Sequence, residues 1–381
     1  MSRQNKYNKY ENSRLLQDIA ERVWQAVEKV LYSDSEEVHF KKRNDFLSFA
    51  GNDNKTGIVF KGKTVYVAGE EIKVLIKHRD TYAKEALKNE VKMCRIKRKW
   101  HKNSWRYYVD IVLDGEPPKK HKTANGTVGI DIGPSTIAVD SENSSILEEL
   151  GKDVDSIEKE LRVMNRKIDR QRRASNPENY NPDGTIRKNT KTFKKKWKRS
   201  KSQLKTEHKR RESYRLRKAK LELSHNLLAN RILELGNKII IEDMEFHALA
   251  KRAKETNKDE NGKFKSKKRF GKSIQNHAPS KFINILEWKL KNNGGELIKV
   301  DCFKTAATQF DHTSGAYYKH ELSERFVTLD NGDVIQRDLH SAFNLRHLII
   351  IQDSKTVMYE YDINSMNLHY ADFKIRHDAL I

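Results

Sequence analysis

Residues 127–140 show the alternation of apolar and small or polar positions that is typical of two short β-strands. The first strand covers 127–132, the glycine and proline at 133–134 break it, and the second strand covers 136–140. This pattern predicts a tight β-hairpin. Asp131 lies on the opposite face of the first strand from the isoleucines on either side of it.

From this stretch alone, two interpretations of Asp131 are open. In one, Asp131 is a solvated side chain of an ordinary hairpin. In the other, it is the first metal ligand of a nuclease with an RNase H-like core. The second interpretation requires further carboxylates elsewhere in the sequence, because hard divalent cations take oxygen ligands from several elements.

Two further carboxylates meet this requirement. Glu242 ends the apolar run Ile239–Ile241, which is typical of a central strand covered on both faces, and ligands commonly bind at the carboxyl ends of such strands. Asp338 begins a segment of helical spacing that runs to Leu348. The helix dipole alone would also favour an acid at this first position of a helix. Three acids at one sheet edge suit two Mg²⁺ ions, which activate a water and stabilise the leaving oxygen of a phosphodiester. Asp131, Glu242 and Asp338 are therefore candidate metal ligands; the family resemblance described below implies that they are the metal-binding catalytic acids.

The remaining chain alternates between helical and β patterns. The order of strand, helix and strand between residues 238 and 300 is typical of an α/β core, and the β pattern before the hairpin is typical of a small barrel. The periodicity predicts helices at 13–32, 147–173, 279–293 and from 338; strands at 58–60, 65–67, 72–76, 91–100, 105–113, 297–300 and 358–361; and loops at 176–189 and 246–272.

The charge balance indicates a polyanionic partner. Lys and Arg total 76 against 53 Asp and Glu, a formal charge of +23 at pH 7. This exceeds the net charge of about 2–8 that suffices for solubility of a small domain, and each neutralised phosphate releases counterions. No apolar run approaches the ~20 residues of a membrane span, no signal-peptide pattern opens the chain, and Cys94 and Cys302 suit a reducing compartment. We expect a cytoplasmic protein that does not contact a membrane.

The basic residues are concentrated in two segments. Residues 186–220 contain 17 Lys or Arg and two acids. One interpretation is a solvated or disordered segment; beside a nuclease site, we favour a helical hairpin along a nucleic-acid duplex. Residues 263–270 form a second basic run in a loop. The candidate nucleic-acid-binding residues are Lys194, Lys195, Lys196, Lys198, Arg199, Arg210, Arg211, Lys267, Lys268 and Arg269.

The strand at 91–100 carries a third group of bases, at 95–99. Charged positions on a strand are often a solvated face or a protected edge. The alternative is a basic face that binds the backbone of RNA, with Trp100, Trp105 and neighbouring tyrosines packing or stacking. The sequence leaves both interpretations open.

The three acidic motifs are similar to those of a known family. Gly-Ile-Asp131-Ile-Gly, Ile-Ile-Glu242-Asp-Met and Arg-Asp338-Leu-His-Ser-Ala-Phe-Asn resemble the three RuvC motifs of TnpB (OrfB), a family of transposon-encoded RNA-guided nucleases related to compact type V CRISPR effectors. The resemblance runs from about residue 60 to about residue 350. It implies an Mg²⁺-dependent, RNA-guided DNA endonuclease with one RuvC site, in the prokaryotic nucleoid. The implied partners are a guide RNA encoded near its own gene and double-stranded target DNA, with no protein partner required.

Pattern and resemblance together predict five parts of the chain. The fold class is α/β, with an RNase H-like (RuvC) core preceded by a small β-barrel. The parts are a helical recognition segment at 1–56, a wedge-like β-domain at 57–122, a RuvC-like core at 123–302 with a basic helical insertion at 144–235, a target-binding insert at 303–336, and a last RuvC helix with the C-terminal tail at 337–381.

The insert at 303–336 differs from the family pattern. Many TnpB proteins have a zinc ribbon here, but this segment contains no Cys, and its candidate ligands are His312 and His320. Structural zinc takes four nitrogen or sulfur ligands, so we expect none. Two alternatives to the nuclease remain open: a guide-dependent DNA-binding repressor that does not cut, and a compact type V CRISPR effector. The apolar residues expected to form the core of the insert are Phe310, Tyr317, Tyr318, Leu322, Phe326, Val327 and Leu329.

Overall fold

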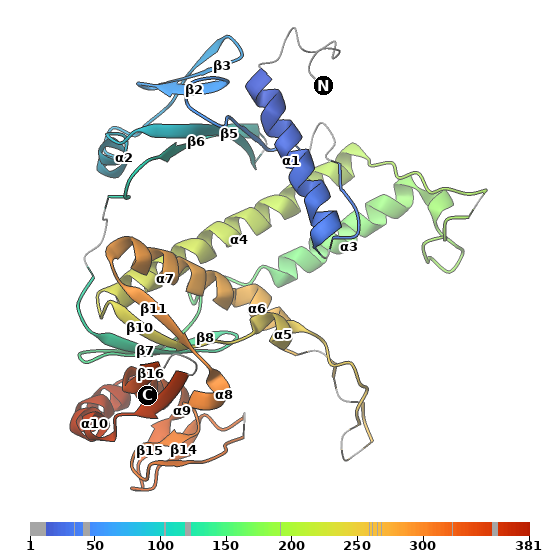
Figure 1. Cartoon of the computed structure of the whole chain (residues 1–381). Helices are drawn as coiled ribbons and strands as arrows, with labels where there is room; N and C mark the ends of the chain where they lie inside the picture. Colours follow the sequence, from blue (N-terminus) through green and yellow to red (C-terminus); the bar gives the residue numbers. More distant parts are fainter. Residues whose placement is uncertain are drawn as a thin grey trace. The chain divides into compact units, whose positions relative to one another are not determined.

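A computed structural model describes most of the chain, namely residues 13–33, 35–40, 46–102, 104–118, 123–190, 192–258, 260, 262–264, 266–267, 269–321, 323–352 and 357–381. The chain divides into two compact units, and each is described by itself (Figure 1). The first contains Met1–Lys120 and Met164–Glu212, and the second contains His121–Val163 and Ser213–Ile381. No helix among the described residues has the length and apolar character needed to cross a membrane.

The first unit contains two small antiparallel sheets among its described residues. One has the order β1-β5-β6, with β1 (Ser48–Ala50), β5 (Val91–His101) and β6 (Ser104–Leu113). The other has the order β2-β3-β4, with β2 (Ile58–Lys61), β3 (Thr64–Val67) and β4 (Glu70–Lys73). They share one core, made of Ile58, Phe60, Val65, Val67, Cys94 and Ile96.

The prediction of a small closed barrel is therefore wrong for the described strands. The second sheet ends at β4, whose four side chains are all exposed, as is typical of an edge strand rather than of a strand inside a barrel. The unit also contains α1 (Ser13–Tyr32), whose bounds agree with the predicted helix, and α2 (Thr81–Ala86), which the periodicity did not predict. Asp80 caps α2 through its carboxylate.

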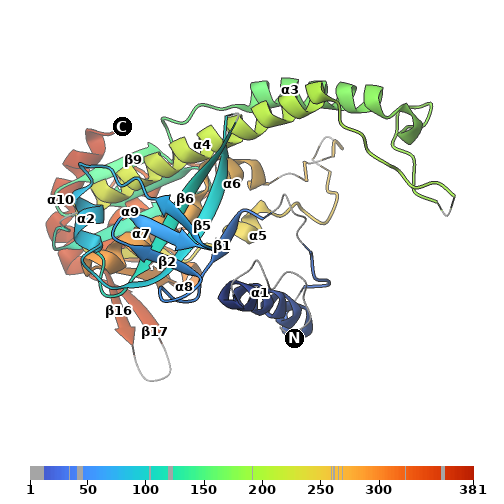
Figure 2. The ribbon, with the colours of Figure 1, turned by 90° about the horizontal axis from the view of Figure 1, so that it is seen from above.

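A long helical hairpin is made by α3 (Glu158–Ser175) and α4 (Lys201–Leu233). Figure 2 shows the two helices side by side, and hydrogen bonds join them at Gln171–Ser202 (2.7 Å) and Asn165–Arg210 (2.8 Å). The prediction of a helical hairpin over 186–220 is confirmed only for its second part, because residues 201–220 lie in α4, whereas the described residues between 186 and 200 lie in no helix. The predicted start at 147 is wrong, because Ser145–Glu149 is a strand, β9.

The second unit is built on a five-stranded mixed sheet with the order β11-β10-β7-β8-β9. β7 (Thr127–Ile132), β8 (Thr136–Asp140) and β9 form an antiparallel meander, while β10 (Lys238–Glu242) and β11 (Glu296–Val300) run parallel to β7. The chain is thus of the mixed α/β class, as predicted. β9 pairs with β8, so the predicted insertion cannot begin at residue 144.

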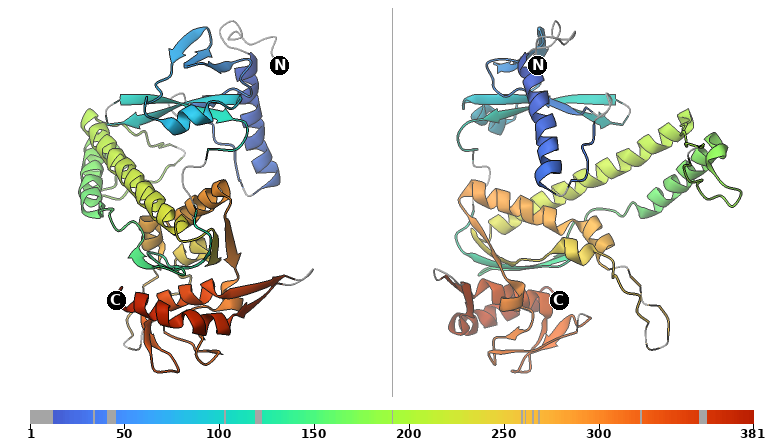
Figure 3. Two further views of the ribbon diagram at one scale, coloured as in Figure 1. Left: turned by 90° about the vertical axis from the view of Figure 1, so that its left-hand side faces the viewer. Right: turned by 45° about the vertical axis from the view of Figure 1, so that its right-hand side comes forward.

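Helices cover both faces of this sheet, as the two views of Figure 3 show. On one face, apolar residues of β7, β8 and β10 pack against the last turns of α4 and against α7 (Pro279–Asn293). α7 agrees with the predicted helix, beginning at a proline and ending at Gly294, which has a φ of 79°. On the other face, Ala138 of β8 packs against α9 (Arg337–Arg346) and α10 (Ile363–Asp378).

Short elements complete the second unit. The predicted loop at 246–272 contains a helix, α5 (Phe246–Ala250), and α6 (Gly271–His277) starts within it, so that prediction is wrong at both ends. α8 (Cys302–Thr305) follows the sheet. Three two-stranded ribbons lie around α9: β12 (Phe310–Asp311) with β13 (Ala316–Tyr317), β14 (Phe326–Thr328) with β15 (Val334–Gln336), and β16 (Leu348–Gln352) with β17 (Val357–Tyr361).

The core of the insert at 303–336 is smaller than predicted. Phe310, Val327 and Leu329 are buried against α9 and α10. The aromatic rings of Tyr317, Tyr318 and Phe326 are about half exposed, because the ribbons are too short to enclose them. The remaining predicted residue, Leu322, lies outside the described residues.

Candidate functional site

Asp131, Glu242 and Asp338 come from three elements that meet at one edge of the mixed sheet. Asp131 lies on β7 and Glu242 ends β10. Ile241 of β10 pairs with Ile130 of β7 in the parallel register. The residues that follow them are Glu242 and Asp131, so the two carboxylates occupy adjacent positions on neighbouring strands. Asp338 lies in the first turn of α9, which packs on β7.

Gly129 determines how closely α9 approaches β7. A Cβ atom at this position would lie 1.9 Å from the Ala342 carbonyl oxygen and 2.5 Å from the Arg346 amide nitrogen. Gly129 and Asp131 point to the same face of the strand, and Asp338 lies about one turn before Ala342 on the helix. The close crossing at Gly129 therefore places the start of α9 over Asp131.

The three carboxylates are close enough to affect each other electrostatically. Burial raises the pKa of Asp131 to about 8, and the charges of Asp338 and Glu242 add to that rise. The Arg337 guanidinium opposes it. Burial also raises the pKa of Glu242. These surroundings thus favour the neutral, protonated form of Asp131.

A short segment at the end of α8, residues 305–307, fixes the position of Glu242. The Thr305 hydroxyl and the Ala307 amide both donate to Oε1 of Glu242, at 3.0 and 3.1 Å. The Asn344 amide of α9 in turn donates to the Ala307 carbonyl at 2.9 Å, and the Tyr361 hydroxyl donates to the Thr305 carbonyl at 2.9 Å. α9 therefore holds two of the three acids, one directly and one through this segment.

Asp338 contacts two arginines. Arg337 bonds to its Oδ1 at 3.2 Å, and Arg325 approaches its Oδ2 at 3.3 Å. Within the part of the chain that the structure describes, no three Asp, Glu, His or Cys side chains are grouped so that they would hold a metal ion. The acids converge, but their present rotamers do not form a complete ligand set.

The donor chemistry of the three acids nevertheless fits a divalent cation. All three offer carboxylate oxygens, the ligands that Mg²⁺ prefers, and Mg²⁺ keeps several waters and needs one or two carboxylates. Burial and, after it, the charges of Asp338 and Glu242 raise the pKa of Asp131, and a bound cation would offset these charges. Asp131 and Glu242 would hold such an ion, with Asp338 joining if it exchanged its arginine contacts.

The sequence did not reveal the residues that support the acids. Thr305, Ala307 and Arg325 lie in segments without a recognisable pattern, and their contacts depend on how the chain folds. Asn344 was within the quoted motif around Asp338, and its position two turns into α9 was the one available signal.

The candidate nucleic-acid-binding residues are divided between the two units. The extended segment before α4 carries five of them, α4 carries two, and the loop before α6 carries two described residues; Lys268 lies outside the described residues. Arg199 and Arg211 line a common pocket, whereas Arg210 bonds to Asn165 instead. In order, the residues are Lys194, Lys195, Lys196, Lys198 and Arg199; Arg210 and Arg211; and Lys267 and Arg269.

Comparisons with known proteins give a similarity of fold. No family model matches the chain, and no curated protein matches it. Among solved structures, a chain of the Cas12f1–sgRNA–target DNA complex has a TM-score of 0.52 and 12% identity, with coverage of 88% of this chain and 71% of that one. A CRISPR–Cas12f ternary complex gives a TM-score of 0.31 and 16% identity, with coverage of 88% and 70%. At 12% identity, the first similarity establishes a shared mixed α/β fold.

Proposed function

We propose that this protein is an RNA-guided endonuclease that hydrolyses DNA complementary to a bound guide RNA, at a single RuvC-type site formed by Asp131, Glu242 and Asp338. Divalent cations, when bound there, supply an activated water and stabilise the leaving oxygen. The observation that carries this proposal is the convergence of three carboxylates from β7, β10 and α9, where burial and the charges of Asp338 and Glu242 raise the pKa of Asp131.

The surrounding residues have defined tasks under this proposal. Thr305 and the Ala307 amide orient Glu242 through Oε1, and neither bond uses its second oxygen. Gly129 keeps the start of α9 over Asp131. Arg325 and Arg337 hold Asp338, and a phosphate entering the site would compete for these guanidinium groups because they favour phosphate as well as carboxylate.

The shared fold and the charge of the chain support the nucleic-acid partners. The solved relative with the same fold is described as a complex of Cas12f1 with sgRNA and target DNA. The net charge of +23 and the basic hairpin of α3 and α4 are suited to phosphate backbones. The motif resemblance favours a transposon-encoded TnpB-type protein; a compact type V CRISPR effector is the alternative, and the genes beside this one distinguish the two.

The test is a purification followed by a cleavage assay. The protein is expressed with its native flanking DNA, the RNA that copurifies with it is sequenced, and DNA matching the variable end of that RNA is incubated with Mg²⁺. Asp131→Ala and Glu242→Gln should each lower cleavage by at least about 100-fold, since even partners of ligating groups contribute about 10–100-fold. RNA binding should stay within about twofold, because neither acid favours a polyanion.

The matched control is Asp243→Asn, which removes an exposed carboxylate directly beside Glu242. Its cleavage should match that of the unmodified protein. Unchanged cutting by both Asp131→Ala and Glu242→Gln would overturn the assignment of the site. Absence of any specific copurifying RNA would overturn the guided mechanism.

One observation favours a second function, a guide-dependent DNA-binding repressor. Asp338 forms ion pairs with Arg325 and Arg337. A carboxylate that only stabilises the fold, and binds no metal ion, would form the same kind of ion pair. Binding of matching DNA with repression of a nearby promoter, and without cleavage at any Mg²⁺ concentration, would establish this alternative.

A further inference from the structure

We propose that a pocket of the first unit binds an unpaired nucleotide of the guide RNA. The pocket has a volume of about 730 Å³ and is lined by Leu47, Arg98, Trp100, Trp105, Arg199, His208 and Arg211. This inference rests on the proposed function for the identity of the RNA. The site itself follows from the charge, the aromatic rings and the size of the pocket.

Four parts of the chain supply the described lining of the pocket. The hairpin of β5 and β6 supplies Trp100 and Trp105, and α4 supplies His208 and Arg211. Arg199 comes from the segment before α4, and Leu47 directly precedes β1. The Glu212 carboxylate accepts a bond from the Lys102 amide at the tip of the hairpin, 3.3 Å away. The hairpin is thereby joined to α4, so the walls of the pocket hold each other in position.

The charge of the pocket suits a phosphate. Among the described residues, three guanidinium groups line it and no carboxylate does. Arg199 has a carboxylate nearby, Glu207 at 3.5 Å, but its side chain is still 56% exposed. Arg211 forms no ion pair with any described residue, and its side chain is exposed. Guanidinium groups bind phosphate oxygens in a bidentate manner, so Arg199 and Arg211 provide the phosphate-binding side.

The aromatic residues provide a surface for a base. Trp100 packs edge-on against Trp105, with ring centroids 5.2 Å apart, and against His208 at 5.1 Å. Its indole nitrogen donates to the Lys102 carbonyl at 2.9 Å, which fixes the ring. Arg98 lies 4.4 Å from the centroid of Trp105, whose ring is still 37% exposed. Bases stack on exposed indoles and on guanidinium planes.

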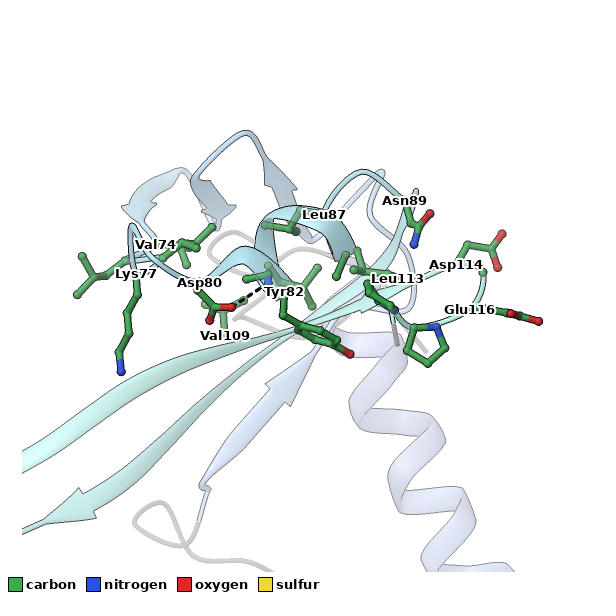
Figure 4. A pocket seen from close by; sticks show the side chains of 18 residues that line it. Val74, Lys77, Asp80, Tyr82, Leu87, Asn89, Val109, Leu113, Asp114 and Glu116 are labelled. Carbon is green, nitrogen blue, oxygen red and sulfur yellow. Dashed lines mark hydrogen bonds between the residues drawn. The ribbon is translucent and has the colours of Figure 1, made fainter. Parts of the chain in front are cut away.

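A second pocket of the same unit lacks, in its described lining, the net positive charge and the exposed tryptophan of the first pocket. Figure 4 shows this pocket of about 650 Å³, lined mainly by apolar side chains such as Val74, Leu87 and Val109. Its charged lining residues, within the part of the chain that the structure describes, are the acids Asp80, Asp114 and Glu116 and one amine, that of Lys77. A polyanion is disfavoured there. The two pockets have comparable volumes, so charge and ring exposure distinguish the nucleotide-binding pocket from the other one.

The pocket requires the nucleotide to be unpaired. Volumes of about 300–1,000 Å³ suit small ligands, which includes one nucleotide but not a base pair with its backbone. A base inside a duplex cannot stack on a protein ring without leaving the helix. The expected ligand is therefore a nucleotide in a single-stranded or bulged part of the RNA.

The first experiment tests stacking. Binding of a fluorescent single-stranded RNA of about 15 nucleotides is measured for the full chain, with a duplex RNA and a single-stranded DNA as further arms. Trp105→Leu should weaken single-strand binding about tenfold, within the range measured for loss of one stacked base, and leave duplex binding within twofold. Trp288→Leu, at an exposed tryptophan of α7, is the matched control. Trp105→Phe should restore most of the affinity.

The second experiment tests phosphate contact. Arg211→Gln should weaken single-strand binding about five- to tenfold and reduce the slope of log K against log salt by about 0.7, the value for one phosphate contact on a single strand. Lys205→Gln removes one exposed charge from the same helix outside the pocket, and its slope and affinity should stay close to those of the unmodified protein.

The outcomes separate this inference from the proposed function. If the unmodified protein binds and cleaves as proposed but Trp105→Leu and Arg211→Gln behave like their controls, the pocket assignment is overturned and the nuclease is not. If both variants lose single-strand binding while cleavage activity is absent in every form, the pocket stands and the nuclease fails. Equal losses with RNA and single-stranded DNA would support a nucleotide site that does not read the ribose hydroxyl.

Discussion

Asp131 and Asp140 lie on the same β-hairpin, face the same helix, and have opposite surroundings. Asp131 opposes Ala138 and Asp140 opposes Gly129 in the antiparallel register, so both carboxylates point to the face that α9 covers. The start of α9 brings another acid, Asp338, to Asp131. About two turns later, α9 brings Arg346 to Asp140 at 3.2 Å.

Asp140 has fixed positive partners. Arg346 and Arg376 each approach it at 3.2 Å, and the Ser145 hydroxyl donates to it at 2.6 Å. Burial raises the pKa of Asp140, while the two guanidinium groups and the hydroxyl lower it. Asp131 has other carboxylates as its main charged neighbours instead. A carboxylate with built-in cations stabilises the fold, whereas one held against other carboxylates is suited to a cation from solution.

The largest expected effect is the loss of stability in Asp140→Ala. This variant leaves the buried Arg346 guanidinium, 6% exposed, without its carboxylate, and breaking a buried ion pair from one side lowers the free energy of unfolding by about 3–5 kcal/mol. Urea unfolding of the full chain measures the loss.

Asp131→Ala is the matched comparison, since it removes the same side chain from the same hairpin. It should change the free energy of unfolding by less than about 1 kcal/mol, because burial and the neighbouring acids both disfavour the charged form of the lost carboxyl group. Equal destabilisation by the two variants would mean that Asp131 also has a structural role, and the contrast would fail.

The next effect in size is stabilisation by Mg²⁺. A ligand that binds the folded state alone raises the free energy of unfolding by about 2.7 kcal/mol at one hundred times its dissociation constant. The midpoint temperature of thermal unfolding should therefore rise as MgCl₂ is added. The ionic strength is kept constant, because salt screens the repulsion within a chain of net charge +23.

The shift should disappear in Asp131→Asn and persist in Asp243→Asn, which carries its substitution outside the group of three acids. Persistence in both would show that Mg²⁺ binds elsewhere. This measurement needs no cleavage activity, so it tests the cation site even if the protein acts as a repressor.

Local patterns predicted the elements that carry their own signals. The alternation at 127–140 gave β7 and β8, the run before Glu242 gave β10, and a proline with a following glycine pair gave α7. The sheet order and the parallel pairing of β10 then brought the predicted acids to one edge. Their catalytic roles remain a proposal.

The surroundings of the two aspartates could not be predicted in this way. The periodicity did not predict β9, because the last three of its five residues belong to the stretch from 147 to 173 that has helical spacing. Arg376 lies on α10, far along the chain from Asp140, and its tail segment has no clear apolar stripe. Sequence alone gave no means to tell the aspartate that pairs with arginines from the one that faces acids, because both sit in similar hairpin positions.

The smallest effect compares the two hydroxyls that serve these acids. Thr305 donates to Glu242 at 3.0 Å, and Ser145 donates to Asp140 at 2.6 Å. The Thr305 hydroxyl also contacts the Asp301 carbonyl, and the Ser145 hydroxyl also accepts from Nε of Arg376. Thr305→Val and Ser145→Ala remove these contacts as well, so each should lower the free energy of unfolding by about 1–2 kcal/mol. Thr305→Val should also lower cleavage about tenfold, since groups that orient a metal-binding residue contribute about 10–100-fold. Ser145→Ala should leave the rate of cleavage unchanged at temperatures where the protein stays folded. Melting curves measure the stability of each variant, and single-turnover assays measure its cleavage rate. A lower rate in Ser145→Ala would show that the hydrogen bonds around Asp140 also position the three acids, because α9 contacts both aspartates.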